Sequence, residues 1–407
     1  MATPTIPNGE EYFFPIIYEG NGAAQKVGKF VPFTDNLAVA NSVLYNDDDD
    51  AYLAKTFSTP TNNKKWTYSV WLKLGALGTN RALLSANVDG AEYFDLFFTT
   101  GNVLKVQNRI SSSNDLLSST SRKFEDTSKW YHFLIVYDSD NSTSADRYIV
   151  YVDGDRQIVD DEAGSGVASA FNKSGVQHQV GISNTLGGSL GYEFDGYFAE
   201  ANFIDGQALA PADFGITDTS TGRWVPVAFP TTLTTFTVTV ANPGSGNKYY
   251  IDGALQATVT LQEGGVYRFD QSDSSNSTHP LRFSTTSDGS HGGGSEYTTG
   301  VTTNGTPGST GAYTEITVAS GAATLYYYCT AHSGMGGTAN TPDPFGSNGF
   351  KLKFQQSNAL GDDTSGKGND FTSSGLTTTD QTTDSPTQNF ATGTATASSG
   401  NVVPHTI

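Results

Sequence analysis

The chain has 407 residues, a length that accommodates two or three domains. Acidic residues outnumber basic residues by 41 to 22, and the resulting formal charge of −19 disfavours a nucleic acid partner. A single cysteine excludes an intrachain disulfide framework, and the absence of a long apolar run predicts no membrane span.

The first segment, residues 1–60, is expected to form an N-terminal arm and the first strands. Its start lacks the basic and apolar regions of a signal peptide, so we expect either a removed leader or another route out of the cell. Residues 11–18 have the composition of a strand that could dock on a neighbouring subunit.

Short segments with strand periodicity begin at Trp66. Residues 66–72, 93–98 and 130–137 alternate with the period of two that is typical of strands. Residues 148–159 have the pattern of a β-hairpin, with an Asp-Gly turn in the middle. Strands at this spacing, with no helical stretch between them, predict a two-sheet sandwich.

A second series of strand-like segments lies between about residue 233 and residue 341. The expected strands are residues 235–240, 248–252, 257–269, 279–285, 313–318 and 325–328, and glycine-rich loops at 288–294 and 304–311 interrupt them. Beyond them, residues 371–400 are rich in Thr, Ser and Gly with few apolar anchors. We expect that stretch to be extended and held only by its neighbours.

Several segments resemble the strand series of laminin-G-like, concanavalin-like jelly rolls. The resemblance is carried by residues 66–72, 130–138, 151–154 and 194–200. Residues 203–209, 213–215 and 222–226 are similar to the version found in bacteriophage virion proteins, in which the sequence continues as Asn-Gly-Phe-x-Leu-x-Phe. Here this continuation follows only at residues 348–354, so the region between looks like a domain inserted into a loop of the sandwich.

The only cysteine shares a short loop with a histidine and a methionine. Cys329, His332 and Met335 directly follow the apolar segment 325–328, and His279 opens a strand far upstream. Two imidazoles, one thiolate and a weak thioether are the ligands of a mononuclear type 1 copper site. The order, one distant His and then C-x2-H-x2-M, resembles cupredoxins, and this resemblance implies all four residues as copper ligands. The alternative, that Cys329 and Met335 are buried apolar fillers, stays open.

Together these patterns predict an all-β chain. A concanavalin-like jelly-roll sandwich would be interrupted by a cupredoxin-like Greek-key β-sandwich. The expected parts are the N-terminal arm with the first strands (1–60), the first part of the laminin-G-like sandwich (61–230), the inserted cupredoxin-like domain (231–342), the completion of the sandwich (343–370) and a Thr/Ser/Gly-rich C-terminal tail (371–407).

Acidic residues supply weaker candidates for other sites. The runs at 47–50 and 160–162 offer the oxygen ligands that Ca²⁺ prefers, although such runs are usually solvated turns. Glu193, Asp195 and Glu200 resemble the paired carboxylates of β-glucanases on the same fold. Their spacing puts Glu200 on the opposite strand face from the other two, which disfavours a retaining glycosidase.

The leading hypothesis is a structural and adhesive surface protein of a phage particle, a head or tail fibre component that binds host-surface glycans and is not an enzyme. Its expected partners are other virion proteins, those glycans and further copies in a homo-oligomer. The expected location is the virion surface, or alternatively the extracellular space. A copper-binding redox or electron-transfer protein is the main alternative, and a glycoside hydrolase is a minor one.

Overall fold

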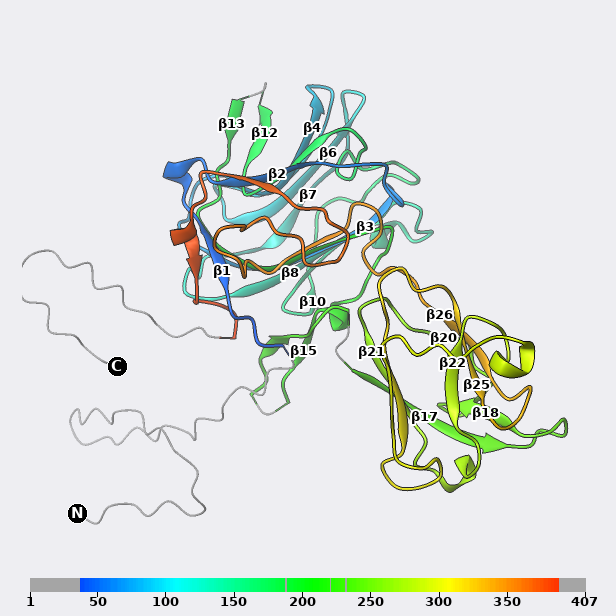
Figure 1. The fold of residues 1–407 in the computed structure, drawn as a ribbon. Coiled ribbons are helices and arrows are strands. Elements are labelled where there is room, and N and C mark those ends of the chain that lie inside the picture. Colours follow the sequence, from blue (N-terminus) through cyan, green and yellow to red (C-terminus); the bar gives the residue numbers. More distant parts are fainter. Residues whose placement is uncertain (1–36, 187–188, 220, 231–232, 388–407) are drawn as a thin grey trace, which may run out of the picture.

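In the computed structural model the chain forms two β-sandwiches that lie side by side (Figure 1). The structure describes residues 37–186, 189–219, 221–230 and 233–387. These residues contain strands and short 3-10 helices, and the predicted all-β class is confirmed. No helix in the described ranges is long and apolar enough to cross a membrane. The arm strand expected at residues 11–18 and the tail after residue 387 lie outside the described residues.

The larger sandwich consists of an eight-stranded and a seven-stranded sheet. The first has the order β10 (Asp155–Arg156), β9 (Tyr148–Val152), β8 (Tyr131–Asp138), β3 (Lys65–Leu74), β14 (Gly196–Asp205), β1 (Ser42–Tyr45) and β29 (Gln381–Thr382), and β27 (Phe350–Leu352) also pairs with β14. The second has the order β28 (Thr372–Ser374), β2 (Tyr52–Thr56), β11 (Gln177–Val180), β4 (Arg81–Asp89), β5 (Glu92–Phe98), β6 (Val103–Ile110) and β7 (Ser113–Lys123).

Two small hairpins and several 3-10 turns complete this sandwich. The hairpins are β12 (Ser183–Leu186) with β13 (Ser189–Gly191), and β15 (Gly215–Thr217) with β16 (Trp224–Pro226). The 3-10 turns are η2 (Asp47–Asp49), η3 (Ser144–Asp146), η4 (Pro211–Asp213) and η7 (Thr378–Asp380). The chain after residue 371 thus supplies an edge strand to each sheet, β28 beside β2 and β29 beside β1.

Alternation along the central strands explains how the sheets pack. In β3, Trp66, Tyr68 and Val70 are fully buried in the core between the sheets. Trp71 belongs to a separate cluster on the outer face of its sheet, as the period of two requires. Inside, Trp66 stacks on Tyr137 with ring centroids 5.5 Å apart, which is typical of a core that relies on aromatic side chains.

The strand β14 joins the segments that precede and follow the second sandwich. β1 pairs with its first half through Val43 and Phe198, and β27 pairs with its second half through Phe350 and Phe203. Between the two halves the register with β3 shifts, and Glu200 adopts a positive φ of 44°. Because of this bulge, β1 and β27 both pair along the same edge of β14. The segment that follows the second sandwich therefore forms a strand of the larger sandwich.

The second sandwich has its own core and two sheets. The larger sheet has the order β19 (Ala254–Leu255), β18 (Lys248–Ile251), β17 (Thr234–Ala241), β21 (Val266–Asp270), β24 (Tyr313–Thr317) and β23 (Val301–Asn304). The smaller has the order β20 (Val259–Thr260), β26 (Gly337–Asn340), β25 (Leu325–Cys329) and β22 (Leu281–Ser284), and η5 (Ser274–Asn276) and η6 (Gly289–Gly292) lie in connections. Each sheet contains one parallel pair, β17 with β21 and β20 with β26.

Two details of this sandwich differ from the sequence prediction. Residues 257–269 were expected to form one strand, but Gly264, with a φ of 78°, makes a turn that separates β20 from β21. β19, β23 and β26 were not predicted, because these strands are two to four residues long and lack the apolar alternation of a buried strand.

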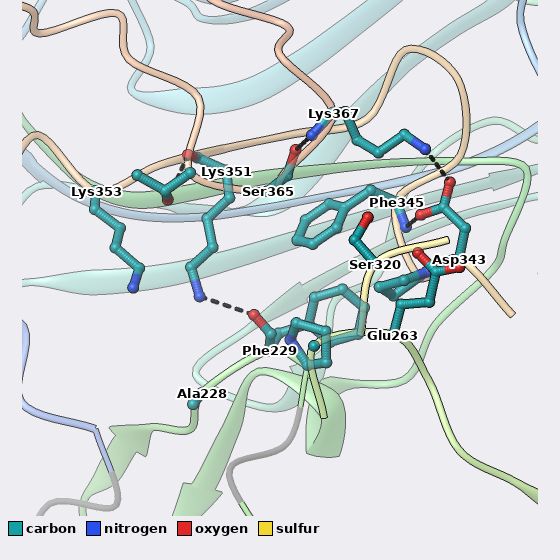
Figure 2. Close-up of a pocket in the computed structure, with 14 residues that line it drawn as sticks. Ala228, Phe229, Glu263, Ser320, Asp343, Phe345, Lys351, Lys353, Ser365 and Lys367 are labelled. Atoms are coloured by element: carbon teal, nitrogen blue, oxygen red, sulfur yellow. Dashed lines mark hydrogen bonds and ion pairs between the residues drawn. The ribbon is translucent and has the colours of Figure 1, made fainter. Parts of the chain in front are cut away.

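A cavity of about 280 Å³ lies at the junction of the two sandwiches (Figure 2). Lys351 Nζ donates to the Phe229 carbonyl oxygen at 2.8 Å and lies 3.6 Å from the Glu200 carboxylate. Burial lowers the pKa of Lys351. The carbonyl and the carboxylate together satisfy an ammonium group that would otherwise be costly to bury.

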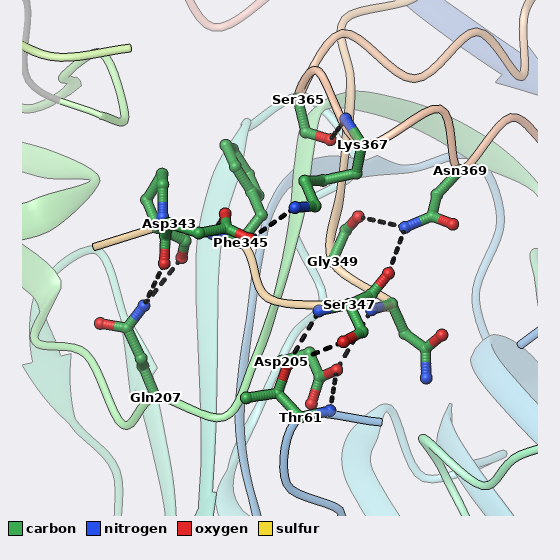
Figure 3. A network of polar contacts seen from close by, with 12 residues as sticks. Thr61, Asp205, Gln207, Asp343, Phe345, Ser347, Gly349, Ser365, Lys367 and Asn369 are labelled. Carbon is green, nitrogen blue, oxygen red and sulfur yellow. Dashed lines mark hydrogen bonds and ion pairs between the residues drawn. The ribbon is translucent and has the colours of Figure 1, made fainter. Parts of the chain in front are cut away.

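A polar network around Asp205 holds the returning chain (Figure 3). Asp205 Oδ2 accepts from the backbone N–H groups of Thr61 at 2.7 Å and Asn348 at 3.1 Å. Its Oδ1 accepts from the Asn62 backbone at 3.0 Å and from Asn172 Nδ2 at 2.7 Å. One buried carboxylate therefore connects three segments that are remote from it in sequence.

Candidate metal centre

Strand pairing brings His279 and Cys329 together. Cys329 is the last residue of β25 and pairs with Leu281 of β22, two residues after His279. The Thr330 N–H donates to the Pro280 carbonyl oxygen at 3.1 Å and continues the contact past the end of the strands. His332 follows in the tight turn that leads to β26, so its imidazole returns toward the thiol.

The three side chains converge through particular atoms. Cys329 Sγ lies 3.8 Å from His279 Nδ1 and 3.7 Å from His332 Nδ1, and the ring centroids of the two histidines are 4.5 Å apart. A metal ion bound trigonally, with bonds of about 2.0 Å to nitrogen and about 2.3 Å to sulfur, would hold those two atoms about 3.7 Å apart. The donor atoms therefore match the spacing of a trigonal His₂Cys site.

The fourth predicted ligand, Met335, is buried in the same apolar cluster as Cys329. The thiol is fully buried, whereas His332 is exposed, so the cluster lies at one end of the sandwich with an edge open to solvent. The role of Met335 as an axial ligand stays a prediction.

Surrounding groups hold both the ring and the backbone of His279 in place. Asn247 Nδ2 lies 3.3 Å from its Nε2, which leaves Nδ1 on the side of the thiol. The Tyr249 hydroxyl and Gln271 Nε2 both donate to the His279 carbonyl oxygen, at 2.8 and 2.9 Å. Burial, and then the neighbouring His332, lower the pKa of His279. A neutral imidazole held in one orientation is the form that binds a metal ion.

The turn that carries His332 is held from both ends. Gly334 donates its N–H to Asp288 Oδ1 at 2.8 Å, and its carbonyl oxygen accepts from Lys248 Nζ at 2.5 Å. The Met335 carbonyl oxygen accepts from the Tyr249 N–H at 3.0 Å. These supporting residues could not be recognised from the sequence, because they come from segments far from the Cys-His-Met loop and carry no motif of their own.

The acidic candidates do not form a comparable cluster. Within the described ranges, the one group of three or more His, Cys, Asp or Glu side chains close enough to share an ion is His279, Cys329 and His332. Residues 47–49 form the 3-10 turn η2, and the Asp160 carboxylate accepts from the Ser118 hydroxyl and the Ser119 N–H. Calcium binding by these runs stays a prediction.

The larger sandwich is a concanavalin-like jelly-roll domain. Residues 46–215 match the family model described as the concanavalin A-like lectin/glucanases superfamily. The matched region includes strands from both sheets of the larger sandwich and ends before the second sandwich begins. No curated protein matches the chain.

Three solved structures illustrate the similarity. A heptameric SAP-like pentraxin from Limulus polyphemus is 15% identical, with 43% of this chain and 80% of that chain covered and a TM-score of 0.33. The CBM40 of the Ruminococcus gnavus IT-sialidase is 14% identical, with coverages of 33% and 73% and a TM-score of 0.27. The NanB sialidase from Streptococcus pneumoniae is 16% identical with a TM-score of 0.34, and the matched region spans 52% of this chain but only 33% of the sialidase.

Proposed function

We propose that this protein is an adhesive surface component of a phage particle, and that its jelly-roll domain binds host-surface glycans. The observation that carries the proposal is the match of residues 46–215 to a superfamily of lectins and glucanases. The resemblance of residues 203–209, 213–215, 222–226 and 348–354 to phage virion proteins supports the location on the particle. Other virion proteins and further copies of this chain are the proposed partners, and the extracellular space is the alternative location.

Binding, rather than hydrolysis, is the activity that we propose for this domain. A retaining glycosidase needs two accessible carboxyl groups that face each other across the scissile bond. Glu200 is buried against Lys351, where a substrate cannot reach it. This contact favours a structural role for Glu200, one of the three candidate carboxyl groups.

The expected result on an array of host-surface polysaccharides is saturable binding of the full chain without release of reducing sugar. Binding is expected because the domain belongs to a lectin-type fold, and antibodies against the chain should label purified particles. A chain that binds no glycan on the array would contradict adhesion. Particles that lack the protein would contradict the virion location, but they would not change the conclusion on glycan binding.

A second function is favoured by a specific observation, the convergence of two Nδ1 atoms and one thiol in the second sandwich. We propose that this sandwich is a cupredoxin-like domain whose ligands are His279, Cys329, His332 and Met335. Copper bound there would supply one-electron redox chemistry. The protein would contribute a fixed ligand geometry, a buried thiol and one exposed histidine edge.

Addition of Cu²⁺ is expected to produce an intense thiolate-to-copper absorption band and the matching EPR signal. A Cys329→Ser variant should lose the band entirely, because the hydroxyl cannot replace the thiolate. The matched control is His291→Ala. This histidine contacts the Cys329 carbonyl oxygen at 3.1 Å but lies outside the ligand cluster, so the band should remain. A band that survives in the Cys329→Ser variant would refute the assignment.

A further inference from the structure

A groove on the outer face of the eight-stranded sheet contains three of the four tryptophans of the chain. We propose that this groove is the subsite that holds a neutral sugar ring, an inference that rests on the glycan-binding function proposed above. The groove has a volume of about 420 Å³ and lies between the β9–β10 turn, the hairpin β15–β16 and the segment near Pro386. This volume is within the range of ligand sites in proteins.

The tryptophans come from different elements that pack together on this face. Trp71 lies on β3, Trp130 immediately precedes β8 and Trp224 opens β16. The indole N–H of Trp130 donates to Asp384 Oδ1 at 3.0 Å, and this carboxylate also pairs with Lys73 at 2.7 Å. Trp71 and Trp130 are largely buried and form the floor, whereas Trp224 is partly exposed.

Trp224 is held in one orientation. Its indole N–H donates to His132 Nδ1 at 3.1 Å, and the two rings lie nearly parallel, at an angle of 22° with centroids 6.0 Å apart. Two glycines give it room, since a Cβ at Gly154 would approach the Trp224 ring to 2.6 Å and a Cβ at Gly215 would also collide with it. A rigid, partly exposed aromatic ring is suited to stack on the C–H face of a sugar without an entropic cost at binding.

Charged groups of both signs border the tryptophans. Asp153 is engaged, since it pairs with Lys129 at 2.7 Å and accepts from the His132 N–H at 2.9 Å. The Asp155 carboxylate makes no hydrogen bond or ion pair with other described residues and is exposed, and Arg223 lines the same wall. An exposed carboxylate near an indole can accept hydrogen bonds from the hydroxyl groups of a sugar ring.

The charge balance of the wall selects the class of ligand. Lys129 neutralises Asp153, and the exposed carboxylate of Asp155 would repel the carboxylate of a sialic or uronic acid. An apolar ligand would bury the Asp155 carboxylate without a partner, at a cost in free energy. A neutral hexose can place its C–H groups against the tryptophan rings and its hydroxyl groups beside the polar side chains of the groove.

The test is a titration of the full chain with methyl glycosides of glucose, galactose and mannose, and with any glycan positive on the array, followed by tryptophan fluorescence. Three indoles line the groove and Trp66 is fully buried in the core, so binding should shift the emission. Trp224→Ala and Asp155→Ala are each expected to weaken binding at least tenfold. Ile158→Ala, at an exposed residue that does not line this groove, is the matched control and should bind like the unmodified chain.

The Trp224 and Asp155 variants distinguish a failure of the proposed subsite from a failure of the adhesive function. Asp155 is exposed and unpaired among the described residues, so its replacement keeps the test valid even if Trp224→Ala fails to fold, which near-UV circular dichroism would reveal. If glycans bind the unmodified chain and Asp155→Ala equally well, the groove is not the subsite and the adhesive function stands. If the unmodified chain binds no sugar, both the subsite and the adhesive function fail.

Discussion

Acidification from pH 7.5 to pH 5 is expected to remove about 4 kcal/mol from the unfolding free energy of the jelly-roll domain through two buried histidines. Burial lowers the pKa of His132 to about 3 and that of His178 to about 3, against an ordinary value of 6.5. At a pH between these two pKa values, each imidazole is protonated in the unfolded chain and neutral in the folded chain. Stability is therefore complete above pH 6.5 and falls, by about 1.4 kcal/mol per pH unit for each histidine, as the pH falls toward 3.

Hydrogen bonds explain why each imidazole must stay neutral. The ring of His178 accepts the Asn172 N–H at its Nε2, at 2.8 Å, and its Nδ1 lies 2.9 Å from the Val176 carbonyl oxygen, to which it donates. His132 accepts from Trp224 at Nδ1 and lies 2.9 Å from the Ser69 hydroxyl at Nε2. A second proton on either ring would point at an N–H donor. The Asn172 N–H or the Trp224 indole N–H would then be buried without an acceptor.

Urea unfolding at several pH values, followed by tryptophan fluorescence, measures this effect. No tryptophan lies between residues 234 and 340, so the signal reports on the jelly-roll side of the molecule. His132→Gln and His178→Gln should each reduce the slope of stability against pH. Phe98→Leu is the matched control: Phe98 is buried in the same core and its ring contacts Phe124 and Phe133, so this change should lower stability equally at every pH. Histidine variants that keep the full slope would refute the assignment.

The sequence was sufficient for the parts of the structure that depend on local patterns. Period-two alternation located β3, β5 and β8, and the Asp-Gly pair located the turn between β9 and β10. The spacing C-x2-H-x2-M identified Cys329 and His332, which the structure brings together with His279. In each case residues within about ten positions of one another determine the feature, so one stretch of chain is enough to recognise it.

Features that depend on distant pairings were not predictable in this way. The tryptophans of the groove stand at positions 71, 130 and 224, and only the register of β3 with β8 and the fold of the hairpin β15–β16 bring them to one face. Each of them individually has the sequence pattern of a core aromatic. The supporting contacts of the metal centre are equally remote, since Asn247 and Asp288 reach it from two other connections.

Replacement of Asp205 by alanine is expected to destabilise the jelly-roll domain by about 4 kcal/mol, because it leaves four hydrogen-bond donors without their acceptor. Two of these bonds are buried, and a buried unsatisfied donor costs about 1–3 kcal/mol. The donors at Thr61, Asn62 and Asn348 are backbone N–H groups that cannot turn toward other partners. Asp205→Asn should be nearly as harmful, because its amide nitrogen would face two of these donors.

The same fluorescence-detected urea unfolding at pH 7.5 measures this change, and Asp126→Ala provides the matched control. Asp126 also accepts from a backbone N–H, that of Ser128 at 2.9 Å, but it lies in an exposed turn, so its loss should cost less than about 1 kcal/mol. A loss of similar size in the Asp205 and Asp126 variants would contradict the central role of the Asp205 network. A much larger loss of stability in the Asp205 variant would mean that one carboxylate, remote in sequence from its partners, anchors the segments that precede and follow the second sandwich in the chain.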